Sequence, residues 1–161
     1  MFAVNHQTNR ISPVKTKSFS ELGFTERKHL QEWLAHQPDA LGEELLIIQK
    51  EFDGFDDTRE RLDLLALDKD GNLVIIENKL DDSGRDVVWQ ALKYASYCAS
   101  LSKAQIVEIY QQYLHRYESL NAAVEASEQS GQIPEKAIDA ASRICEFLEA
   151  PDLDEVKLNL G

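Results

Sequence analysis

The fold is decided by two apolar runs, Arg61-Leu-Asp-Leu-Leu-Ala-Leu-Asp68 and Asn72-Leu-Val-Ile-Ile-Glu-Asn-Lys79. They flank the short segment Lys69-Asp70-Gly71. Apolar runs separated by Asp-Gly are a strong β-hairpin signature, because Asp and Gly adopt the backbone conformations that tight turns require. The sequence therefore predicts two antiparallel strands joined by a short turn, with charged side chains near their open end.

The register of this hairpin decides where the charged side chains point. A two-residue turn at Asp70-Gly71 would put Asp63 and Glu77 on opposite faces of the sheet. A three-residue turn with Gly71 in the left-handed conformation would instead place Asp63 directly opposite Glu77. We expect the second register, because it groups Asp63 with Glu77 and Lys79 at one end of one face and leaves the middle of both faces apolar.

Two carboxylates on facing strands call for a nearby cation. Cross-strand partners lie about 4.5–5.5 Å apart at Cα, so Asp63 and Glu77 repel each other unless a positive charge lies between them. Oxygen ligands at this charge density suit Mg²⁺ (or Mn²⁺), which also takes a substrate phosphate as ligand. Lys79 can then orient an attacking water or offset charge on the phosphate, and Gln90 can position either group. The alternative is an inert, solvated salt-bridge cluster at a sheet edge.

Helical signals lie before and after the hairpin. Thr25 is a suitable N-cap, and apolar residues at helical spacing up to Pro38 predict a helix over residues 25–36. The apolar run from residue 45 predicts a strand ending near residue 52. After the hairpin, helical signals resume at residue 82 and continue to residue 101.

The last third of the chain predicts a helical hairpin. Ser102-Lys-Ala-Gln105 is a capping box that starts a helix, and Pro134 starts another. The second helix is expected to present Ile138, Ala141, Cys145 and Leu148 on one face. The first carries a heptad-like apolar seam, formed by Ile106, Tyr110, Tyr113, Tyr117, Leu120 and Val124.

The composition is that of one globular domain. The chain has 161 residues, of which 43% are hydrophobic. No apolar run approaches the ~20 residues that span a bilayer, and the N-terminus has no apolar signal segment. We therefore expect a cytoplasmic protein with no membrane partner. Cys98 and Cys145 have no partner at metal-binding spacing and are expected to be buried free thiols.

The net charge of −12 weighs against a nonspecific DNA-binding protein, because phosphate neutralisation supplies most of the affinity of such proteins. The charge is uneven along the chain. Residues 1–28 carry five basic and two acidic side chains, whereas the remaining residues carry 12 basic and 27 acidic ones. Acidity around a site also suits a protein that collects divalent cations.

Residues 61–79, followed by Trp89-Gln-Ala-Leu-Lys-Tyr-Ala95, resemble the PD-(D/E)XK restriction-endonuclease-like superfamily. Within it, the nearest likeness is to uncharacterised bacterial relatives of the archaeal and actinobacterial mismatch endonucleases, over roughly residues 24–98. The resemblance implies an α/β (α+β) fold with an αβββαβ core around a central mixed sheet. It also implies metal-dependent endonuclease activity on DNA.

The same resemblance implies residue roles. Asp63 and Glu77 match the metal ligands, Lys79 the catalytic lysine, and Gln90 the helix glutamine, with Tyr94 as its companion. Position 78 is often aliphatic in relatives, but the backbone carbonyl of Asn78 can still bind metal. The acidic residue of the first helix falls on Glu26, which would join the catalytic set, and Glu51 is its rival.

We expect four segments: a tail (1–20), a nuclease-like core (21–101), the helical hairpin (102–150) and the start of a truncated core strand (151–161). An incomplete sheet exposes an edge, so a homo-oligomer is expected through that edge or through the Tyr110–Val124 helix. The function predicted first is Mg²⁺-dependent hydrolysis of DNA. The alternative is a catalytically inactive nuclease-like module that binds nucleic acid or assembles with a protein.

Overall fold

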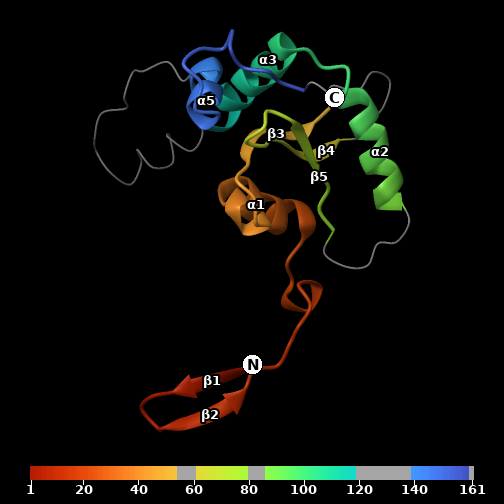
Figure 1. Ribbon diagram of the computed structural model, residues 1–161. Coiled ribbons are helices and arrows are strands. Elements are labelled where there is room, and N and C mark those ends of the chain that lie inside the picture. The colour runs from red at the N-terminus through yellow and green to blue at the C-terminus, as the bar shows by residue number, and fades with distance from the viewer. Residues whose placement is uncertain (54–60, 80–85, 119–138, 160–161) are drawn as a thin grey trace.

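The computed structural model describes residues 1–53, 61–79, 86–118 and 139–159 as a mixed α+β structure with two small antiparallel sheets (Figure 1). The larger sheet has the strand order β3-β4-β5. Its strands are β3 (Leu46–Phe52), β4 (Leu62–Leu67) and β5 (Leu73–Ile76). The α-helices are α1 (Gln31–His36), α2 (Asp86–Cys98), α3 (Lys103–Tyr113) and α5 (Ala140–Phe147).

The element order α1-β3-β4-β5-α2 agrees with the first five elements of the predicted αβββαβ order. The sheet differs from the prediction in one respect. Both of its strand pairs are antiparallel, and the described residues contain no parallel strand that would make it mixed.

The β4–β5 hairpin has the register expected from a three-residue turn. Leu64 pairs with Ile76, and Leu67 pairs with Leu73. Gly71 has a φ of 81°, in the left-handed region, and its N–H donates to the carbonyl of Asp68 at 3.1 Å. The Asp68 carboxylate also accepts from the backbone N–H groups of residues 70 and 72. The turn therefore fixes the pairing that the apolar pattern favoured.

Both faces of the larger sheet are covered, as predicted. One face packs against a large core built with α2, α3, α5 and residues 156–158. The other packs against a smaller cluster that includes Leu34 and Ala35 of α1. The two faces of the hairpin belong to different clusters, Leu65, Leu67, Leu73 and Ile75 to the first and Leu64, Ala66, Val74 and Ile76 to the second.

The helix predicted over residues 25–36 is present as a π-helical turn, η2 (Glu26–Leu30), that continues into α1. Thr25 is the N-cap residue, but its side chain makes no capping bond. The capping box at Ser102 is confirmed, because Ser102 and Gln105 exchange both hydrogen bonds at the start of α3. This helix continues as η4 (Leu114–Glu118), and Leu120 and Val124 lie outside the described residues.

The prediction for the last helix is partly wrong. The described helix, α5, follows Asp139, whose carboxylate caps it by accepting from the N–H of Ser142 at 2.9 Å. Ala140 and Ile144 are its buried residues, so the predicted face is displaced by one position. Residues 134–138, including the predicted start at Pro134 and Ile138, lie outside the described residues.

The cysteine prediction is confirmed for Cys98 alone. Cys98 is buried, and burial raises the pKa of its thiol to about 11. Cys145 is also free but only half-buried, so the expectation of two buried thiols was wrong in that respect.

The two ends of the chain also differ from expectation. The predicted tail contains a hairpin of β1 (Phe2–Asn5) and β2 (Arg10–Pro13). The sequence analysis overlooked it because its strands are only four residues long. Residues 156–159 show strand-like alternation, with Val156 and Leu158 buried, but they form no strand in the described structure. Instead, the N–H of Asn159 donates to the carbonyl of Gly71 at 2.9 Å.

Replacing Gly71 by alanine should destabilise the fold more than the same change at Gly42. Both glycines have positive φ, so alanine pays about 1–2 kcal/mol of backbone strain at either position. A Cβ at Gly42 would meet open space, whereas one at Gly71 would collide with the carbonyl oxygen of Lys157. We expect the free energy of unfolding, measured with urea, to fall by at least about 1 kcal/mol more for Gly71→Ala. Equal losses would show that residues 157–159 move aside at little cost.

Candidate charged site at the open end of the β4–β5 hairpin

Asp63 and Glu77 are brought together by the hairpin register. The last described pair is Leu64 with Ile76, so one further step along both strands places Asp63 opposite Glu77. The strands stay in contact there, because the backbone N–H of Asn78 donates to Oδ2 of Asp63 at 2.8 Å. This hydrogen bond fixes the orientation of the Asp63 carboxylate. The sequence prediction that these two acids are neighbours is consistent with this geometry.

Lys79 forms an ion pair with Glu77. Its Nζ donates to Oε1 of Glu77 at 3.0 Å, and the exposed fractions of the two side chains are 26% and 7%. The second carboxylate oxygen of Glu77, Oε2, is buried and has no hydrogen-bond partner among the described residues. Burying a carboxylate oxygen without a hydrogen-bond donor lowers the stability of the fold. This atom can therefore accept a hydrogen bond or bind a cation.

The electrostatics of the site favour added positive charge. Burial raises the pKa of Asp63, opposed by the hydrogen bond from the Asn78 backbone and by the charges of Lys79 and Arg27. Burial also raises the pKa of Glu77, opposed by its hydrogen bond with Lys79 and reinforced by the charge of Asp63. Both carboxylates are therefore less stable in their ionised form than they would be in water.

Lys79 is held in its charged form. Burial alone would lower the pKa of its ammonium group. The hydrogen bond with Glu77, together with the charges of Glu77, Asp63 and Glu26, outweighs burial, so the pKa lies above its ordinary value. Lys79 is consequently a permanent cation and hydrogen-bond donor at neutral pH, and it does not act as a base.

Of the two acids considered as the first-helix contribution, Glu26 acts on this site. Its negative charge raises the pKa values of both Asp63 and Lys79. Glu51, the rival, is engaged by guanidinium groups, at 3.1 Å from Arg27 and 3.1 Å from Arg61. Glu26 thus belongs to the electrostatic surroundings of the site.

The two site residues predicted on α2, Tyr94 and Gln90, make different contacts. The hydroxyl of Tyr94 is buried and donates to the carbonyl of Arg61 at 3.1 Å, which ties α2 to the chain just before β4. Tyr94 therefore positions the elements that carry the site. Gln90 lies one turn earlier and is half-buried, and within the described ranges it has no hydrogen bond to Asp63, Glu77 or Lys79.

The donors present at the site fit a small oxygen-preferring cation. Mg²⁺ and Mn²⁺ prefer carboxylate oxygens as ligands, and the site offers two carboxylates. Both have raised pKa values, and one oxygen of Glu77 is buried without a partner in the described part of the chain. Among the described residues, no three His, Cys, Asp or Glu side chains gather as a metal-binding group. An ion here would depend on Asp63, Glu77, the expected carbonyl of Asn78, and water.

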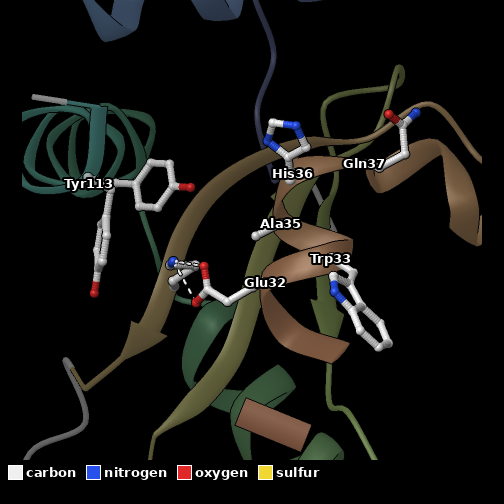
Figure 2. A pocket seen from close by; sticks show the side chains of 8 residues that line it. Glu32, Trp33, Ala35, His36, Gln37 and Tyr113 are labelled. Atoms are coloured by element: carbon white, nitrogen blue, oxygen red, sulfur yellow. Dashed lines mark hydrogen bonds and ion pairs between the residues drawn. The ribbon is translucent and has the colours of Figure 1, made fainter. Parts of the chain in front are cut away.

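A separate cavity, which the sequence analysis did not find, lies between α1, β3 and the end of α3. Its volume is about 490 Å³. Figure 2 shows Tyr113 on one side of it and Ala35 and His36 of α1 on the other. The Nζ of Lys50 contacts both carboxylate oxygens of Glu32 at 2.8 Å. This ion pair is therefore part of the cavity wall.

Two tyrosines of the predicted heptad-like apolar seam line this cavity. Tyr110 is buried in the core of its own chain, whereas Tyr113 and Tyr117 line the cavity. The Nζ of Lys50 lies 4.5 Å from the centre of the Tyr117 ring, a cation–π distance.

Comparison of the chain with protein-family models, curated proteins and solved structures finds no match. Within the described residues, none of the helices is both long and apolar enough to cross a lipid bilayer.

Asp63→Asn should raise the stability of the protein at neutral pH. The raised pKa means that the folded state binds a proton more tightly than the unfolded state, so stability falls as pH rises through that window and stays lower above it. Asparagine removes the charge and can still accept from the N–H of Asn78. We expect a melting temperature higher by a few degrees at pH 7, with the difference vanishing below the ordinary pKa of 3.8. A less stable variant at pH 7 would show that Lys79 and Arg27 more than offset burial.

Proposed function

We propose that the protein is a metal-dependent endonuclease that hydrolyses phosphodiester bonds of DNA at the Asp63–Glu77–Lys79 site. One observation carries the proposal: two partly buried carboxylates with raised pKa values lie beside an ammonium group, 3.0 Å from one of them. Partly buried acids of this kind lower the stability of a fold. They are therefore typical of functional sites, where the chemistry requires them. The resemblance of residues 61–95 to the PD-(D/E)XK superfamily, and the element order α1-β3-β4-β5-α2, point to the same function.

The residues of this chain would have separate roles in the reaction. Asp63 and Glu77, with the carbonyl of Asn78, would hold the ion. When bound, the ion polarises the phosphoryl oxygen and lowers the pKa of water. The backbone N–H of Asn78 keeps Asp63 oriented for this role, at 2.8 Å from its Oδ2.

Lys79 would act on the reacting phosphate. Because its pKa is raised, it stays protonated and can donate hydrogen bonds to the attacking water or to a phosphate oxygen. Negative charge develops on the phosphate in the transition state, and a positioned cation stabilises that charge more strongly than it stabilises the substrate. Arg27 provides a second positive charge within electrostatic range of Asp63.

A second candidate function is that of a catalytically inactive module, which keeps the nuclease-like fold and binds nucleic acid or a protein partner without cleaving DNA. The net charge of −12 favours it, because an acidic surface repels the phosphates of a long duplex. It predicts that divalent ions stabilise the protein without any cleavage of DNA.

The decisive experiment is a cleavage assay on supercoiled and linear DNA with Mg²⁺ or Mn²⁺. We expect Glu77→Gln and Lys79→Met each to reduce the cleavage rate by about 100-fold or more, because each removes charge from the reacting centre. Lys69→Met is the matched control for Lys79→Met. The ammonium group of Lys69 pairs with Glu44 and Glu149 away from the site, so this variant should retain its activity.

Thermal melting with and without Mg²⁺ tests the metal site that both functions share, and the cleavage assay separates them. Both functions require that the ion raises the melting temperature of the wild type and not that of Glu77→Gln. Cleavage that persists in Glu77→Gln and Lys79→Met would identify a contaminating nuclease and remove the proposal. Stabilisation by the ion with no cleavage of any DNA form would establish the inactive module.

A further inference from the structure

The N-terminal hairpin is an apolar element on which no other part of the described chain packs. The β1–β2 pairing puts Phe2, Val4, Ile11 and Pro13 on one face. Every residue from 1 to 23 is exposed, and Ile11 exposes 68% of its surface. Figure 1 shows the hairpin standing away from the rest of the molecule, beyond α1. We call residues 1–18 the arm.

An isolated two-stranded hairpin is at best marginally stable in water, so its apolar face needs a surface to cover it. The base of the arm is fixed to the body. The ring of Phe19 lies 6.1 Å from that of Phe24 and 5.9 Å from that of Trp33. The arm is thus presented from a defined point beside α1, with its apolar face open.

A matching apolar surface lies on α2. Val88, Trp89 and Leu92 are adjacent on a helix at this spacing, and all three are exposed, Trp89 by 72%. The residues that α2 buries in the core, Tyr94 and Cys98, lie on its other side. A helix that is apolar on opposite sides is typical of one covered on both, so the outer face of α2 is a second surface that needs cover.

Charge decides which surfaces come together. The arm carries three basic side chains and no acidic one, whereas residues 19–161 carry 14 basic and 29 acidic ones. The arm is therefore +3 and the remainder −15. Two arms repel each other, and an arm and a body attract each other, which favours arm-to-body contact over arm-to-arm contact.

The placement of the arm favours a second molecule as the body that receives it. Only residues 14–18 separate the hairpin from the anchor at Phe19, and five residues reach at most ~18 Å. In Figure 1, the hairpin and α2 lie on different sides of α1 and the sheet. We propose that the arm packs its Phe2–Val4–Ile11 face on the Val88–Trp89–Leu92 face of a second copy of this chain. Reciprocal exchange of the two arms closes a two-fold symmetric dimer with two identical contacts.

Sedimentation velocity on single variants tests this contact. We expect the wild type to be a dimer, and Ile11→Asp and Trp89→Asp each to weaken dimerisation by about tenfold or more, because each puts a charge in an apolar contact. Ser12→Asp is the matched control, since it makes the same change on the opposite face of the arm and should remain dimeric. A monomeric wild type overturns the proposal.

Mixing the two disruptive variants identifies the arrangement. Ile11→Asp keeps an intact α2 face, and Trp89→Asp keeps an intact arm, so a mixture should regain heterodimers held by one of the two contacts. An arm-to-arm dimer would instead leave Trp89→Asp fully dimeric, and that result overturns the proposed contact. A Val4→Cys/Leu92→Cys double variant should form a disulfide between two chains. A disulfide within one chain would show that the arm folds back on its own α2.

Discussion

The left-handed conformation of Gly71 is the constraint on which the rest of the structure depends. It sets a three-residue turn, the turn sets the pairing of β4 with β5, and that pairing brings Asp63 to Glu77. A slip of one residue would move every side chain of a strand to the other face. The apolar residues of that strand would then face the wrong cluster, and the two acids would separate. Core packing and the charged site therefore share one cause.

Much of this arrangement follows from residues that are close in sequence. The hairpin, its register and the capping box at Ser102 depend on local backbone chemistry, so sequence reasoning predicts them. The neighbourhood of Asp63, Glu77 and Lys79 follows from the register alone. The surroundings of Glu26 and its rival Glu51 could not be read from the sequence, because the guanidinium groups that engage Glu51 come from separate segments of the chain.

The features that sequence reasoning missed depend on contacts between distant segments. The cavity beside Lys50 forms where α1, β3 and the end of α3 meet, and none of these elements signals it alone. The buried face of α5 differs from the predicted one because packing in the core shared with α3 decides which of its residues are buried, and the local sequence pattern does not show this packing. The β1–β2 hairpin, by contrast, was overlooked for a local reason, because its strands are only four residues long and lie in a polar, mixed segment.

Asn159 joins the turn of the β4–β5 hairpin, which carries the site, to the end of α2. Its N–H binds the carbonyl of Gly71, and its Nδ2 donates to the carbonyls of Cys98 and Leu101 at 2.8 and 3.1 Å. The hairpin turn and the end of α2 are thereby held together by a single residue, while Asp63 and Glu77 lie at the other end of the hairpin. Because Asn159 holds the turn of the β4–β5 hairpin against the end of α2, the C-terminal segment couples the hairpin that carries Asp63 and Glu77 to the helix that follows it in the chain.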